Sequence, residues 1–274
     1  MIVPSLRRVT AAFPEWALTP FETCGTRLRD IGRVHHASLI GLRAVTTFPE
    51  YAPQLFSRKL KRGLNDVLSR IEQSIESITK AAKTAKVDLR QDHFLVNASA
   101  VVSLWSALEV AIEDFLIAWM LNQRSALNVP VLQKIKISLA EYDRLDSEER
   151  MRVLLSELER AVIGKQGVDC FEPLLDTFGL SGKVDQPTKT AIYELQHVRN
   201  VVVHRGGRAD RRFVKGCPGW DVKVGQTVRV KAKHCWDYQR AVAGYVLTVA
   251  ERVAAHLGDT DSPELARLRK LLRT

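Results

Sequence analysis

The stretch that decides the fold is FLVNASAVVSLWSALEVAIEDFLIAWMLNQ, residues 94–123. When this stretch is wound as an α-helix, Leu, Val, Ile and Trp side chains cover most of its circumference. A helix that is apolar on nearly every side has to be surrounded by other elements of the fold. The segment therefore predicts a helical body that is built round one central helix, from about Phe94 to Gln123.

Acidic residues interrupt the apolar run of this central helix. Glu109 and Glu113 lie four residues apart, and therefore on one face, and Asp114 follows them. These acids divide the run from Val101 to Leu121, whereas a membrane span requires roughly 18 uncharged apolar residues. We therefore expect no membrane span. The stripe formed by Glu109 and Glu113 fits either an exposed edge of the helix or carboxylates that serve a site.

The composition is that of a globular protein with excess positive charge. Of 274 residues, 46% are hydrophobic and 26% are charged, which argues against the disordered and fibrous classes. The 41 Lys and Arg residues outnumber the 31 Asp and Glu residues, and the formal net charge is +10. Long-range attraction then favours polyanionic partners such as RNA, DNA or an anionic membrane.

The N-terminus and the cysteines indicate a reducing compartment. Arg7 and Arg8 are followed by neither an apolar run nor a small-residue cleavage site, so we expect no secretory signal and a cytoplasmic protein. Four cysteines lie far apart without Cys-x-x-Cys spacing, which predicts free thiols: Cys24, Cys170, Cys217 and Cys235. A zinc site at Cys217, His234 and Cys235 is the alternative, but a fourth ligand at suitable spacing is missing. We therefore predict neither a metal nor another cofactor.

Periodic apolar residues on both sides of the central helix predict further helices. They are expected at residues 55–85, 138–163, 171–178, 187–205 and 236–257, with a short basic helix after Pro263. The segment before them contains five prolines and is predicted to be rich in loops with short helices. Valines alternate on both sides of Gly225-Gln226, which predicts a β-hairpin at residues 220–231.

The predicted fold is therefore all-α, a helical bundle with one small hairpin insertion. We expect an N-terminal extension over residues 1–53, a helical domain over residues 54–258 and a basic C-terminal tail over residues 259–274.

The residues that suit chemistry lie in YELQHVRNVVVHRGG, residues 193–207, at the end of one predicted helix. Gln196, Asn200 and His204 follow one another at four-residue steps and share a face, and Arg199 flanks them. Histidine exchanges a proton near neutral pH, and arginine offers a planar fork of donors to a phosphate. Together they suit the cleavage of a phosphodiester. Motifs for phosphate-binding loops, serine elbows and zinc helices are missing from the sequence.

The alternative for His204 is a structural one, because a histidine before a helix-ending glycine often only bonds the last carbonyls. The charges that follow favour a substrate instead. From Arg199 to Lys215, six of 17 residues are Lys or Arg, and Asp210 is the one acid. Such an excess suits a polyanion, and we expect five cations to bind RNA: Arg205, Arg208, Arg211, Arg212 and Lys215.

The pattern Arg199-Asn200-x3-His204, in a helix that carries Glu194 and is followed by Arg-Gly-Gly, resembles the Arg-x4-to-6-His signature of the HEPN superfamily. It is especially similar to the RiboL-PSP-HEPN branch. The stretch from Trp105 to Leu116 looks like the helix that packs against the signature in that branch, and the resemblance covers roughly residues 94–257. It implies an all-α bundle that is usually a homodimer, with both signature helices in one composite cleft. Many members are metal-independent endoribonucleases of toxin–antitoxin, abortive-infection or other defence systems.

By this resemblance, Arg199 would bind the scissile phosphate and His204 would transfer a proton as the RNA 2′-hydroxyl attacks, while Asn200 would orient the site. Three residues would have supporting roles: Glu113, Glu194 and Gln196. Of these, Glu113 would hold Arg199 or His204 from the neighbouring helix. The implied partners are RNA, a second copy of the chain, and an antitoxin or defence-system protein. Two alternatives remain, a non-catalytic HEPN module that binds RNA or a partner, and a helical adaptor whose polar face makes buried dimer contacts.

Overall fold

The computed structural model describes residues 13–56, 65–90, 94–138, 142–161 and 166–273. The α-helices in these ranges are α1 (Glu15–Phe56), α2 (Asn65–Arg90), α3 (Phe94–Asn122), α5 (Ser147–Ala161), α6 (Glu172–Thr177), α7 (Gln186–Arg205), α8 (Arg211–Gly216), α9 (Ala232–Leu257) and α10 (Pro263–Leu272). Short 3-10 helices are η1 (Arg124–Asn128), η2 (Leu132–Lys134) and η3 (Gly167–Cys170). Among the described residues there is no β-strand, only one isolated bridge between Arg208 and Thr227. The all-α prediction is confirmed for this part of the chain.

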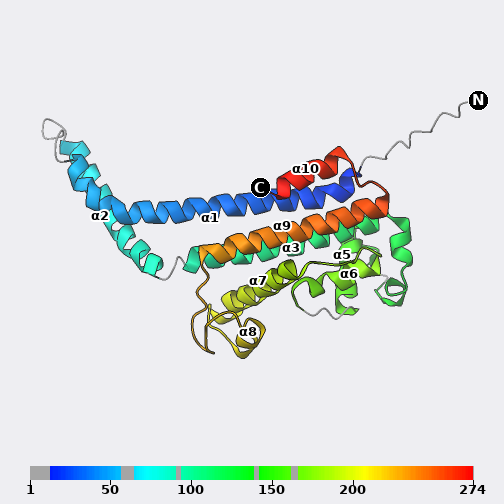
Figure 1. Cartoon of the computed structure of the whole chain (residues 1–274). Helices are drawn as coiled ribbons and strands as arrows, with labels where there is room; N and C mark the ends of the chain where they lie inside the picture. The colour runs from blue at the N-terminus through cyan, green and yellow to red at the C-terminus, as the bar shows by residue number, and fades with distance from the viewer. Residues whose placement is uncertain (1–12, 57–64, 91–93, 139–141, 162–165, 274) are drawn as a thin grey trace, which may run out of the picture.

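Helix α3 is the central helix, as predicted, and the helices are arranged in layers around it. Figure 1 shows α1 on one side of the α3 and α9 pair and α7 on the other, and α3 contacts α1, α5, α7 and α9. Leu108, Phe115 and Leu116 of α3 are completely buried. By length and composition alone, residues 95–122 could cross a membrane. In this fold 56% of that apolar window is buried inside the protein.

The N-terminal segment corrects our prediction of a loop-rich extension with short helices, because residues 15–56 form the single 42-residue helix α1. Residues 1–12 of the predicted extension lie outside the described part. Pro20 costs the helix one backbone hydrogen bond, about 3 kcal/mol. Burial outweighs this cost, since each fully buried apolar side chain contributes about 1.5–3 kcal/mol. The buried stripe of α1 comprises Ala17, Leu18, Phe21, Cys24 and Leu28.

The C-terminal segment forms the predicted amphipathic helix, and that helix is part of the body. In α10, Leu265 and Leu268 are buried, and the helix lies along α1 and α9 (Figure 1). The absence of a side chain at Gly25 of α1 allows this approach, because a Cβ atom there would lie 2.8 Å from Leu271. The two ends of the described chain are therefore packed against each other.

The predicted hairpin at residues 220–231 does not form. The N–H of Gln226 donates to the carbonyl of Lys223, which makes a turn. Gly225 is the third residue of this turn and has φ +85°. Residues after this turn pair instead with the loop that follows α7, where the N–H of Val228 donates to Gly207 over 2.8 Å. The valine alternation has another cause: Val228 and Val230 are buried in the core. Burial of every second residue in a single extended segment leaves the same pattern as a hairpin strand.

Three other predicted helices are found with shifted ends. The helix expected at residues 55–85 is α2, which is described from Asn65, because residues 57–64 lie outside the described part. The helix expected at residues 138–163 is α5, which begins at Ser147, while residues 139–141 and 162–163 of that prediction are also not described. Helix α9 begins at Ala232, one turn before the predicted start.

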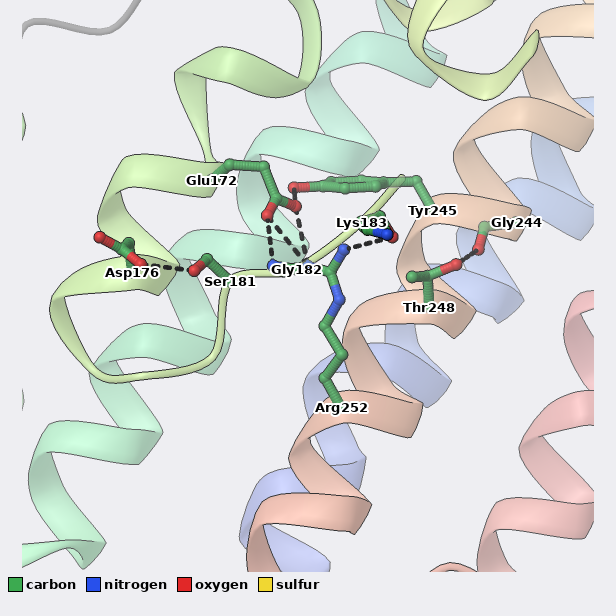
Figure 2. A network of polar contacts seen from close by, with 9 residues as sticks. All are labelled: Glu172, Asp176, Ser181, Gly182, Lys183, Gly244, Tyr245, Thr248 and Arg252. Carbon is green, nitrogen blue, oxygen red and sulfur yellow. Dashed lines mark hydrogen bonds and ion pairs between the residues drawn. The ribbon is translucent and has the colours of Figure 1, made fainter. Parts of the chain in front are cut away.

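A largely buried ion pair holds α6 and the segment before α7 against α9 (Figure 2). The Arg252 guanidinium contacts both carboxylate oxygens of Glu172, at 2.9 and 3.0 Å, and also donates to the carbonyl of Lys183. The Tyr245 hydroxyl and the N–H of Gly182 donate to the same carboxylate. Because Gly182 and Lys183 lie just before α7, these bonds fix where α7 begins.

Candidate active site

Helix α7 carries the candidate site residues, and both of its ends are capped, the second of them at the glycine that the sequence predicts. At its start the Asp185 carboxylate accepts from the N–H of Thr188 over 2.9 Å. At its end Gly206 adopts the left-handed conformation, φ +57°, and its N–H bonds back to Val201. The inner side of the helix packs into the core: Ile192, Leu195 and Val198 are buried, and Val202 is partly buried. The opposite side of the last two turns therefore faces outward and carries the polar residues.

Arg199, Asn200 and His204 form one cluster on that outward side. The Arg199 Nη1 donates to Asn200 Oδ1 over 3.0 Å. The same nitrogen lies 3.5 Å from Nε2 of His204. His204 is exposed and Arg199 is half-buried, so both groups are reachable from solvent. The guanidinium and the imidazole thus lie close to each other at the tip of one helix.

A cavity of about 370 Å³ opens beside this cluster. Asn200 and His204 line it from α7, together with Arg205 at the end of that helix and Arg212 from α8. Arg205 Nε lies 3.7 Å from Asp210 Oδ2, and Asp210 also caps α8 by accepting from the N–H of Phe213. Two of the five predicted RNA-binding cations, Arg205 and Arg212, therefore face the same cavity as His204.

The second histidine of the motif, His197, is largely buried at the inner end of the cavity. Its Nε2 is 2.9 Å from Oε1 of Gln166, and a Cβ atom on Gly216 would lie 2.8 Å from the same nitrogen. Burial lowers the pKa of His197, so the neutral ring is favoured at neutral pH. Because an amide oxygen only accepts, Nε2 carries the proton in this contact. His197 therefore connects α7 to the η3 and α8 segments.

Glu113 and Gln196, predicted to support the site, lie in a different cavity of about 270 Å³, which Glu109 and Glu159 also line. Gln196 Oε1 accepts from the N–H of Gly167 over 2.7 Å, so this side chain anchors η3. Burial and the neighbouring Glu159 and Glu109 raise the pKa of Glu113. Glu113 interacts electrostatically with Arg152 but with neither Arg199 nor His204. Within one chain, the structure therefore gives Glu113 no contact with the Arg199 cluster.

The other predicted residues are dispersed around the end of α7. Glu194 and Arg208 line a larger cavity on another side of that helix, formed with residues 219–234. Arg211 and Lys215 are exposed on α8 and line none of the cavities described here. The structure thus divides the predicted cations between two neighbouring cavities and the surface of α8.

Two residues at the cavity, Gln166 and Asp210, were not predicted as site residues from the sequence. Gln166 follows no local pattern and reaches the site only because η3 packs against α7. Asp210 could have been found, since an Asp before a short helical run is a typical N-cap. Its carboxylate lowers the net positive charge that Arg205 and Arg212 bring to the cavity.

The alternative zinc set does not form a ligand group. Among the described residues no three His, Cys, Asp or Glu side chains are close enough to hold a metal ion. Burial raises the pKa values of the Cys217 and Cys235 thiols to about 12, and Cys235 Sγ contacts the backbone carbonyl of Asn97. His234 Nδ1 accepts from the N–H of Lys231. The three side chains therefore have separate structural surroundings.

In comparisons with known proteins, no family model, curated protein or solved structure matches the chain.

Proposed function

We propose that this protein is a metal-independent endoribonuclease of the HEPN type, with Arg199 and His204 as its catalytic residues. The observation that carries the proposal is the 3.5 Å contact between the Arg199 Nη1 and the His204 Nε2, on the accessible tip of α7. Arginine only donates, so Nε2 is the acceptor in this contact, and its lone pair would become free to take a proton when the guanidinium bonds to a phosphate instead. An imidazole lone pair can remove the proton of a hydroxyl next to a phosphate, and the neighbouring guanidinium can stabilise the charge on that phosphate.

The proposed reaction is an attack of the RNA 2′-oxygen on the adjacent phosphorus. The proton of the 2′-hydroxyl passes to an imidazole, and the bond between phosphorus and the 5′-oxygen breaks. The departing 5′-oxygen takes up a proton, which leaves a 2′,3′-cyclic phosphate and a 5′-hydroxyl end. Arg199 would stabilise the charge on the phosphate oxygens, and Asn200 would hold the guanidinium in place through its 3.0 Å contact.

A second copy of the chain would supply the second proton-transfer group. Val203, the residue before His204, is 48% exposed although it is apolar, and it lies at the tip of α7. An apolar side chain beside the catalytic pair supports a dimer in which the two α7 tips meet. One His204 would then act as the base and the other as the acid.

The decisive experiment compares cleavage of total RNA and tRNA by the wild-type protein and by His204→Ala, with and without EDTA. We expect cleavage that survives EDTA and is lost in His204→Ala, with product ends that carry a cyclic phosphate. His36→Ala removes an exposed histidine from α1 and serves as the matched control, with wild-type activity expected. Equal cleavage by wild type and His204→Ala would remove the proposal.

The alternative of a non-catalytic RNA-binding module has its own signature in the same experiment. Such a module would bind RNA with a steep dependence on salt, because cations displace counterions from the phosphates, and would cleave nothing. The dispersed cations Arg205, Arg208 and Arg212 serve binding equally well. The distinction therefore depends on cleavage by the wild-type protein.

A further inference from the structure

The largest cavity near the end of α7 is separate from the one that His204 lines. Its volume is about 780 Å³, which is within the roughly 300–1,000 Å³ of small-molecule sites. Glu194 of α7 lines one side and His234 of α9 another, while the segment 219–231 supplies the remaining wall. The loop after α7 separates the two cavities, with Arg205 and Asp210 lining the His204 cavity and Arg208 lining the larger one.

Three cations surround this larger cavity: Arg208, Arg229 and Lys231. Arg229 and Lys231 alternate with Val228 and Val230, whose side chains are buried. Successive side chains of an extended segment point to opposite sides, so the anchored valines hold both cations on the outer side. Among the residues described, neither Arg229 nor Lys231 forms an ion pair, and the Arg208 side chain donates to the carbonyl of Gly225 over 3.3 Å.

Aromatic rings and acceptors complete the wall of the cavity. The rings of Trp220 and His234 are 4.4 Å apart, and Trp220 packs edge-on against Phe213. His234 Nδ1 accepts from the backbone, so the proton of the neutral ring is on Nε2, which is left as a donor. Glu194 and Asp221 add carboxylates, which would repel a bare phosphate but accept bonds from a hydroxyl or a base N–H.

We infer that this cavity is a subsite for one nucleotide of a single-stranded RNA, held next to the strand that enters the His204 cavity. Arg208, Arg229 and Lys231 bind its phosphate, and the Trp220 and His234 wall packs against its base. Glu194 accepts a hydrogen bond from the base edge or the ribose. A phosphate, an aromatic base and N–H or O–H donors occur together in a nucleotide, which matches this combination of side chains. The inference rests on the proposed function, because RNA is the substrate in both.

The test measures binding of 5′-AMP, 5′-GMP, 5′-CMP and 5′-UMP to the full chain by calorimetry, without any cleavage step. We expect saturable binding that Arg229→Ala and Arg208→Ala each weaken about fivefold or more. Lys223→Ala is the matched control, since Lys223 is exposed on the same segment but does not line the cavity. The affinity of this variant should stay within about twofold of the wild type.

Two results would overturn the subsite. One is an unchanged mononucleotide affinity in both arginine variants, and the other is an equal loss in Lys223→Ala, which would indicate general charge attraction. Inorganic phosphate in place of the nucleotides should bind much more weakly, and equal binding would also count against a nucleotide site. Cleavage is measured separately, so a loss of the subsite and a loss of the nuclease proposal are distinguishable. If both hold, Arg229→Ala raises KM for RNA about fivefold and leaves kcat within about twofold.

Discussion

The Arg199 guanidinium reaches round the helix axis to His204, with its Nη1 3.5 Å from Nε2. Residues five apart on an α-helix point roughly 140° away from each other, so short side chains at these positions could not meet. The contact forms because the arginine is long and bends over Asn200, to which it donates a hydrogen bond of 3.0 Å. Asn200 therefore positions the pair, and the reach of the arginine is as important as its charge.

The first prediction follows from the length and planarity of the Arg199 side chain. Arg199→Lys keeps the charge but removes the planar fork and its second donor, so we expect RNA cleavage to fall about 100-fold. The rate is measured on a labelled oligoribonucleotide at saturating concentration, and circular dichroism serves as the check on folding. A lysine variant with more than half of the wild-type rate would show that only the charge matters.

The second prediction concerns Asp210, which both caps α8 and lies near Arg205. Asp210→Ala removes the bond to the N–H of Phe213, and the free energy of unfolding should fall by about 1 kcal/mol. Asp210→Asn retains a capping oxygen, so its loss should be less than half as large. Urea unfolding of both variants measures the difference. Equal losses would mean that the carboxylate acts through its charge on Arg205.

The third prediction concerns the Glu172 and Arg252 pair, whose side chains are each 15% exposed. Arg252→Met leaves a largely buried carboxylate without its cation, and we expect a loss of about 3 kcal/mol in unfolding free energy. The double variant with Glu172→Gln should recover at least half of that loss, because no buried charge is then left. Additive losses in the double-mutant cycle would contradict a coupled pair.

The fourth prediction is a dependence of stability on pH at the Glu113 cavity. Burial, Glu159 and Glu109 raise the pKa of Glu113 above its ordinary 4.5, so the folded state keeps the proton longer than the unfolded state. Stability from this group is present below pH 4.5 and declines as the pH rises through the raised pKa. We therefore expect Glu113→Gln to be more stable than the wild type at pH 7, with a difference that shrinks towards pH 4.

Urea unfolding at several pH values measures this effect. Glu76→Gln, at an exposed position on α2, is the control and should follow the wild-type profile. A Glu113→Gln profile that runs parallel to the wild type would show that this carboxyl ionises with equal ease in both states. Cleavage activity provides a further check, because Glu113 lines a cavity separate from that of His204.

Elements that depend on local pattern could be predicted from the sequence. The apolar residues of α3 required a central helix, and Gly206 marked the end of α7. Repetition along one helix also brought Arg199, Asn200 and His204 together, because each lies within one and a half turns of the next. These features rest on contacts between residues close in sequence, which a single chain segment already contains.

Features that depend on contacts between residues far apart in the chain could not be predicted from the sequence. The prolines of the N-terminal segment predicted loops, but burial against α3 holds the long helix α1 there. The alternating valines predicted a hairpin, but one extended segment packs into the core instead. The sequence also grouped Glu113, Glu194 and Gln196 with the site, yet the fold turns each of them towards another cavity. The sequence by itself determined most of the helices and the grouping of Arg199, Asn200 and His204 at the tip of α7. Only the tertiary structure decided which side chains share a cavity, because that depends on how helices far apart in the chain pack around their apolar faces.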